Sequence, residues 1–167
     1  MRYIDYDYFV ALYGYETVTE QQFNRLAWDA ERAIDNYTTG VDGLRKLRVA
    51  FPTDEDDAEA VKRCVCKLVE IMVQIEQAQG QAKNASGFVT REDGTVVNKV
   101  VSSVSSGSES IHYATSNSNM TEIDLAVTDS SAKNKLLERI VRECLTGITD
   151  ANGVNLLFMG EYPRYYL

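Results

Sequence analysis

Apolar side chains recur at the three- and four-residue spacing of a helix between residues 23 and 37. Thr19, followed three residues later by Gln22, has the sequence of a capping box and predicts where this helix begins. Residues 38–40 (TTG) predict its end, and Trp28 lies off the apolar stripe, where it can cover a second surface. The stripe itself consists of Phe23, Leu26, Ala27, Ala30, Ile34 and Tyr37.

A longer helix is predicted from residue 54 onward, with a polar end over residues 74–81 that is weakened by Gly80. Acidic side chains crowd its first turns, where they complement the positive end of the helix dipole. This acidic run is typical of a solvated cap and lacks the glycine-turn spacing of a calcium loop. The buried stripe is expected at Val61, Cys64, Val65, Leu68, Ile71, Met72 and Ile75.

Two further helices complete the expected fold. Asp5 or Asp7 can cap a short helix that stops at Gly14, and the last helix is expected to begin after Asp129 or Ser130. The inner face of that last helix is predicted at Leu136, Ile140, Val141, Cys144 and Leu145. Residues 41–52 read as a loop with at most a short helical turn. The pattern predicts a mainly α protein, a small helical bundle in a single domain spanning residues 1–167, which is long enough to bury a core.

The helical pattern breaks between residues 84 and 119, so a long loop or β-hairpin excursion is expected between the third and last helices. An Asp-Gly pair at residues 93–94 predicts a hairpin turn, and residues 95–101 have strand propensity. Eight serines then occur between residues 102 and 118. Two interpretations stay open: a flexible surface excursion, or a segment that is mobile in the free subunit and ordered by neighbouring subunits.

The candidate interface residues lie in this excursion and in the C-terminal tail at residues 154–167. Ile111 and Tyr113 alternate as the residues on one face of a strand do. Exposed tyrosines add large contact area at low entropic cost, although a tail that folds back onto its own domain is an equal alternative. The candidate interface residues are Ser105, Gly107, Ile111, Tyr113, Tyr162, Tyr165 and Tyr166.

The net charge of −8 changes the range of possible partners. A free-standing nucleic-acid binder needs a basic face, whereas an acidic wall can surround DNA and let it slide. The alternative is that the acidic surface only keeps the protein soluble. The chain has no apolar run of about 18 residues, so no membrane span is expected. Residues 1–16 carry acids and lack a basic region with a cleavage site, so no signal peptide is expected and the chain should stay in the cytosol.

Candidate chemistry is sparse. Cys64 and Cys66 point about 200° apart on a helix and cannot share a metal ion or a disulfide. Cys64 and Cys144 fall on apolar stripes and are expected to act as small buried hydrophobic residues with reduced thiols. The one histidine, His112, has no acid or cysteine at ligand or triad spacing. No phosphate-binding loop, dinucleotide fingerprint or hydrolase motif is present, so no catalytic, cofactor-binding or metal site is expected.

Several segments follow one another in a characteristic order. They are YFVALYG, TEQQFNRLAWDAERAIDNYTTG, DDAEAVKRCVCKLVEIMVQIEQAQ, SSVSSGSESIHY, NKLLERIVRECLTGI and LLFMGE. Over nearly the whole chain, this order and spacing resembles the head-tail connector (head-completion, or adaptor) proteins of long-tailed bacteriophages. The chain departs from that family in its longer excursion at residues 84–119, in its tyrosine-rich C-terminus and in His112, where serine is common.

The resemblance implies a structural virion protein without enzymatic activity. Its subunits would form a closed ring, twelvefold like the portal, that docks beneath the portal protein, extends the DNA channel and contacts a tail or stopper protein. DNA would pass through without sequence-specific binding, and the ring would be assembled in the host cytoplasm and reside at the head-tail junction of the virion. The alternative from another class is a small cytosolic helical adaptor or regulator, and a third possibility is a tail-completion protein.

Overall fold

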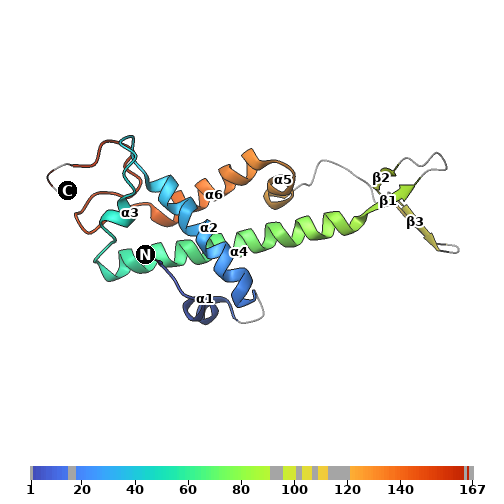
Figure 1. The fold of residues 1–167 in the computed structure, drawn as a ribbon, viewed down its shortest axis with the longest axis horizontal. Coiled ribbons are helices and arrows are strands. Elements are labelled where there is room, and N and C mark those ends of the chain that lie inside the picture. The colour runs from blue at the N-terminus through green and yellow to red at the C-terminus, as the bar shows by residue number, and fades with distance from the viewer. Residues whose placement is uncertain are drawn as a thin grey trace. The chain divides into compact units, whose positions relative to one another are not determined.

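The computed structural model describes residues 2–14, 18–90, 96–100, 103–106, 109–112, 121–163 and 165, with the backbone alone described between residues 81 and 112. The chain divides into two compact units, Met1–Val73 with Asn134–Leu167, and Gln74–Lys133. The elements in chain order are α1 (Tyr6–Tyr13), α2 (Glu20–Thr38), α3 (Lys46–Val49), α4 (Glu55–Ala85), β1 (Ser86–Thr90), β2 (Val96–Val100), β3 (Ser103–Ser106), β4 (Glu109–His112), α5 (Glu122–Thr128) and α6 (Ser130–Leu145) (Figure 1). The predicted fold class, a mainly α small helical bundle, is confirmed.

The helix boundaries follow the capping residues expected from the sequence. The Asp5 carboxylate accepts a hydrogen bond from the backbone N–H of Tyr8, and the Thr19 hydroxyl accepts one from Gln22. Gly14 ends α1 with a φ of 84°, a left-handed conformation that favours glycine. These local contacts explain why α1 and α2 begin where sequence reasoning placed them.

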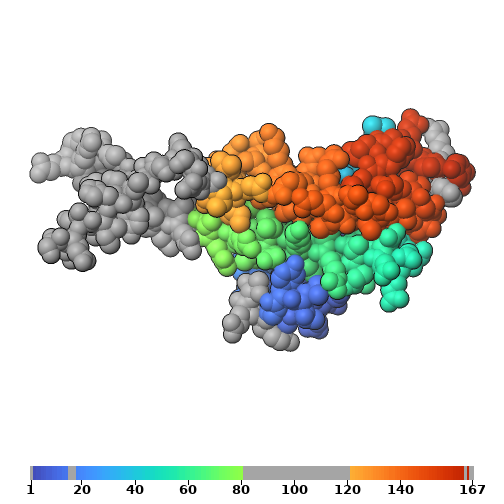
Figure 2. Space-filling view, turned by 180° about the vertical axis from the view of Figure 1, so that it is seen from behind, coloured from blue at the N-terminus to red at the C-terminus, as the bar shows by residue number. Residues whose placement is uncertain are grey.

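In the first unit, α6 and the C-terminal segment that follows it cover one side of the first half of α4 (Figure 2). The short helix α1 lies on the side of α4 opposite α6 in both views, and α2 crosses α4 in the view of Figure 1. The helix α4 buries more residues than the predicted stripe contains: Cys66 and Val69 are as inaccessible as Leu68, and Val73 is nearly so. Ile71, which the stripe included, is only partly buried. A helix that is buried on several faces is apolar on several faces, and one amphipathic stripe underestimates its contacts.

The second unit contains the end of α4 and the excursion. The helix continues through Gly80 to Ala85, because one interior glycine costs only about 1 kcal/mol. In the excursion, β1 pairs antiparallel with β2, and β3 pairs antiparallel with β4. The strand predicted at residues 95–101 is therefore present as β2, whereas the predicted turn at residues 93–94 lies outside the described residues.

The short helix α5 was missed by sequence reasoning. Thr121 and Asp124 form its capping box, in which each side chain accepts a hydrogen bond from the backbone N–H of the other residue. Aspartate at the third position is a weaker sequence signal than the glutamate or glutamine of the usual box. The last helix, α6, begins at Ser130 as expected, after Asp129 accepts a hydrogen bond from the N–H of Ser131.

We expect the free energy of unfolding to fall as the pH rises above about 10. Burial, reinforced by a hydrogen bond to Asp35, holds the pKa of Tyr3 well above its usual value, and burial raises the pKa of Tyr13 to about 12. A phenol whose pKa is raised by folding contributes its full stabilisation below the pKa of the unfolded chain. That contribution is lost as the pH rises toward the folded pKa, because the unfolded state gives up its proton first.

Urea unfolding followed by circular dichroism at about pH 8 and about pH 11, on either side of the unfolded tyrosine pKa, measures this loss. The Tyr3→Phe variant has no phenol to titrate at this position and should lose less stability between the two pH values. An equal loss in the variant and the parent protein would show that Tyr3 does not cause the effect.

Candidate interaction surfaces

A buried polar network ties the N-terminal segment to α2 and α3. The carboxylate of Asp35 accepts hydrogen bonds from the Tyr3 hydroxyl at 2.5 Å and from Nε of Arg48 at 2.7 Å. Glu31 accepts a hydrogen bond from the backbone N–H of Tyr3 at 2.8 Å and lies 3.7 Å from Nη2 of Arg48. Both carboxylates are almost inaccessible, so this network fixes Arg48 in place at the edge of α3.

Beside this network lies an open pocket of about 550 Å³, which also includes Arg2, Asn24 and Trp28. Nη2 of Arg2 donates a hydrogen bond to Oδ1 of Asn24 at 2.6 Å. Trp28 is 57% exposed, and the guanidinium carbon of Arg32 lies 4.7 Å from the centre of its ring. Tryptophan and arginine are enriched at the centres of protein interfaces, because they combine large apolar area with hydrogen bonding. We call this set the Trp28 surface: Arg2, Asn24, Trp28 and Arg32.

The C-terminal segment is anchored by a buried lysine. Nζ of Lys46 donates hydrogen bonds to the backbone carbonyls of Leu156, at 3.1 Å, and Phe158. Burial lowers the pKa of Lys46, and the nearby carboxylates of Asp150 and Asp42 oppose that shift. A buried ammonium needs such partners, so the lysine holds residues 156–158 against α3.

This anchor places three apolar side chains at the surface. The backbone N–H of Val41 donates to the carbonyl of Met159 at 2.9 Å, and Val41, Phe158 and Met159 are all substantially exposed. Gly40 permits the close approach, since a Cβ there would lie 2.5 Å from the carbonyl oxygen of Gly160. We call Val41, Phe158 and Met159 the C-terminal apolar edge. Neighbouring exposed apolar side chains of this kind mark interaction sites.

The structure corrects one candidate interface residue. Tyr162 is only 2% exposed, and its hydroxyl donates a hydrogen bond to Oδ2 of Asp150 at 2.6 Å and accepts one from Asn152 at 2.9 Å. Its backbone N–H donates to Asp42 at 2.8 Å. Tyr162 is therefore a core residue that closes the C-terminal segment onto its own unit, because the network supplies partners for its hydroxyl. Tyr165, in contrast, is 81% exposed.

The candidates in the excursion are placed only by their backbone. Ser105 lies in β3 opposite Ser110, and Ile111 lies in β4 opposite Val104. These pairings bring Ser105 and Ile111 into one hairpin. The other candidates, Gly107, Tyr113 and Tyr166, lie outside the described residues.

Sequence reasoning missed two of these features. The C-terminal apolar edge joins residue 41 to residues 158–159, and no local pattern connects positions so far apart. The second is the meeting of Cys64 and Cys144, which come from different helices and line one pocket. The apolar stripes place both cysteines on inward faces of their helices, and this was the sequence signal for their burial. That the two cysteines meet could be seen only from the packing of the helices.

The described residues contain no cluster of three or more histidine, cysteine or acidic side chains that could hold a metal ion. His112 is described only by its backbone, which pairs with Ser103 in the second hairpin. None of the helices in the described part is long and apolar enough to cross a membrane. No protein-family model, curated protein or solved structure matches this chain.

Proposed function

We propose that this chain is a structural virion protein that forms a ring beneath the portal and joins a phage head to its tail. The observation that carries the proposal is the element order, in which a helical bundle is interrupted between α4 and α5 by the paired strands β1–β2 and β3–β4. The sequence resemblance implies this arrangement, a small bundle with a hairpin excursion that contacts neighbours. A structural role needs no catalytic group, so the proposed protein is not an enzyme.

Ring formation requires two different surfaces on each subunit, because a head-to-tail contact joins unlike patches. The first unit offers the Trp28 surface on α2 and the N-terminal segment, and the C-terminal apolar edge beside α3. Trp28 supplies a large aromatic anchor, while the edge supplies smaller apolar side chains. These two surfaces, together with the excursion, are the proposed contacts with neighbouring subunits and with the portal and tail or stopper proteins.

The net charge of −8 supports a channel rather than a DNA-binding role. Acidic walls repel the phosphate backbone, so DNA would pass through the ring without sequence-specific contacts. The expected location is the head-tail junction of the virion, after assembly in the host cytoplasm.

We expect the excursion to be required for assembly and not for the fold. Residues 102–110 are replaced by a short Gly-Ser linker, and the full chain is mixed with purified portal rings. The variant should keep its helical circular dichroism and its thermal transition but fail to close a ring or to dock on the portal. Light scattering measures the mass, and electron microscopy shows the docking. Normal rings from the linker variant would remove the excursion from the interface.

A point variant tests the described surface in the same experiment. Trp28→Ala should reduce portal docking or ring closure, because central aromatic anchors contribute about 2 kcal/mol or more to an interface. The matched control is Asp29→Ala, since the next residue of α2 points about 100° away around the helix. Unchanged assembly by Trp28→Ala, or an equal loss of assembly in both variants, would contradict the role of this surface.

The parent chain distinguishes the proposed ring protein from the alternative function. A parent chain that stays a monomer or dimer with portal present would favour the helical adaptor instead.

A further inference from the structure

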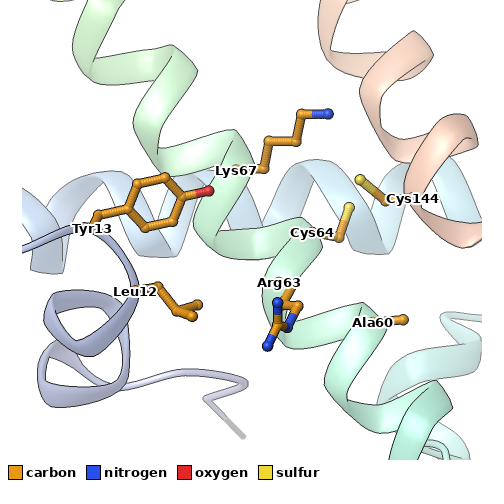
Figure 3. A pocket seen from close by; sticks show the side chains of 7 residues that line it. All are labelled: Leu12, Tyr13, Ala60, Arg63, Cys64, Lys67 and Cys144. Atoms are coloured by element: carbon orange, nitrogen blue, oxygen red, sulfur yellow. The ribbon is translucent and has the colours of Figure 1, made fainter.

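Two cysteines from different helices face one another at the packing of α4 against α6. Cys64 is fully buried, and Cys144 is partly exposed at the rim of an open pocket of about 530 Å³. The two sulfur atoms point toward each other from their helices (Figure 3). Both cysteines line this pocket, and the contact between their side chains shifts the pKa of each.

The surroundings of the two thiols differ. The contact with Cys64 lowers the pKa of Cys144, and the charge of Lys67 lowers it as well, against burial and Glu143. The same contact, together with burial, raises the pKa of Cys64. Cys144 is thus the thiol that ionises first and that the pocket reaches, and thiolates are the nucleophiles in disulfide chemistry.

The pocket is suited to a small anion that approaches Cys144. Arg63 and Lys67 line it together with Leu12, Tyr13 and Ala60 (Figure 3). Arg63 is already paired with Glu59, whereas the charge of Lys67 stabilises the Cys144 thiolate and attracts a negatively charged reactant.

Cys66, in the same helix, is a buried cysteine that lies away from Cys64 and Cys144. It is fully buried, and burial raises its pKa to about 12. Its position is about 200° around α4 from Cys64, so it faces away from the pair. It is therefore a matched control for the chemistry of Cys64 and Cys144.

We propose that Cys64 and Cys144 form a reversible dithiol–disulfide pair that exchanges with a small anionic disulfide of the glutathione class and covalently links α4 to α6. The Cys144 thiolate attacks one sulfur of the disulfide, which breaks its S–S bond, forms a mixed disulfide and releases one thiolate that takes up the proton lost by Cys144. The Cys64 sulfur then attacks Sγ of Cys144, and the second small thiol leaves with the Cys64 proton. Two protein thiols are oxidised to one disulfide, and one small disulfide is reduced to two thiols.

Closing this bond would constrain a long part of the chain. The loop between residues 64 and 144 includes the end of α4, both hairpins and α5. A disulfide that closes so long a loop removes much entropy from the unfolded chain, so the Tm should rise by roughly 10 °C in the oxidised protein. The inference concerns the isolated subunit and does not depend on the proposed role in a virion.

The test uses the full chain in buffers with stepped ratios of oxidised to reduced glutathione. After acid quenching and alkylation, the intact mass should fall by two hydrogens, and peptide mapping should join the peptides that contain Cys64 and Cys144. The rate should rise as the pH increases and should level off below the pKa of an ordinary cysteine, about 8.5, because the Cys144 thiolate is the attacking species and its pKa is lowered. Reduction by dithiothreitol should restore the original mass and the original Tm.

Three variants assign the steps. Cys64→Ser should accumulate glutathione on Cys144, Cys144→Ser should react only at the background rate, and Cys66→Ser should behave as the parent protein does. Circular dichroism identifies any variant that fails to fold, and the parent protein alone still decides the question. Stable glutathionylation of Cys144 without closure, or no reaction before the protein unfolds, would overturn the proposal.

Discussion

Leu68→Ala is expected to lower the free energy of unfolding by about 2–5 kcal/mol, the usual cost of deleting a buried leucine side chain. Leu68 lies on α4 and is completely inaccessible, with Val65 and Val69 also buried on the same helix. Because α4 is covered on several faces, the surrounding structure has little freedom to collapse into the space left behind. Urea unfolding at neutral pH measures the change.

Arg63→Ala is the control on the same helix. Its side chain forms an exposed i,i+4 ion pair with Glu59 at 2.9 Å, which contributes less than about 1 kcal/mol. Leu68→Ala should therefore lower the free energy of unfolding severalfold more than Arg63→Ala does. If Leu68→Ala cost no more than Arg63→Ala, the assignment of α4 as the centre of the core would be wrong.

Asp35→Ala is expected to destabilise the protein by about 3 kcal/mol, because it removes the buried acceptor of two hydrogen bonds, and a hydrogen bond to a charged group contributes about 1.5–3 kcal/mol. The carboxylate is 1% exposed and receives hydrogen bonds from both Tyr3 and Arg48. Its removal leaves the Tyr3 hydroxyl without its acceptor in the interior and leaves Glu31, at 3.7 Å, as a carboxylate beside the partly exposed Arg48 guanidinium. The guanidinium carbon of Arg48 also lies 4.6 Å from the Tyr3 ring centre. The N-terminal segment, α2 and α3 all depend on this one group.

Asp29→Ala, at an exposed position of the same helix, should change the stability by less than about 0.5 kcal/mol. Tyr3→Phe removes only one of the two hydrogen bonds to Asp35. Its loss of stability should therefore lie between the losses of Asp29→Ala and Asp35→Ala. Chemical denaturation of the three variants at one pH ranks them. Equal stability of Asp35→Ala and Asp29→Ala would mean that the network does not hold the N-terminal segment.

Local features of this chain could be predicted because they depend on residues within a few positions of one another. The caps at Asp5 and Thr19, the glycine stop at Gly14 and the start of α6 all involve contacts over two to four residues. The apolar stripes of α2 and α4 follow from the helical period alone. The mainly α class and the presence of strand structure near residues 95–101 were therefore readable from sequence.

The placement of side chains between distant segments could not be predicted in the same way. Tyr162 was a candidate interface residue in a tail that could equally fold back onto its own domain, and it is buried, because Asp150, Asn152 and Asp42 supply its hydrogen-bond partners. Lys46 lies in a segment that was expected to be a loop, yet the carbonyls of residues 156 and 158 satisfy its ammonium in the interior. Each outcome requires partners that are ten or more residues away.

The cysteines show the same division between sequence and structure. The helical period places Cys64 and Cys144 on inward faces, and it separates Cys64 from Cys66. Only the packing of α4 against α6 brings the two thiols together and makes one of them more acidic. A helical period depends on the backbone geometry of one segment, whereas a contact between helices depends on how all segments share one core, and that information is distributed over the whole chain.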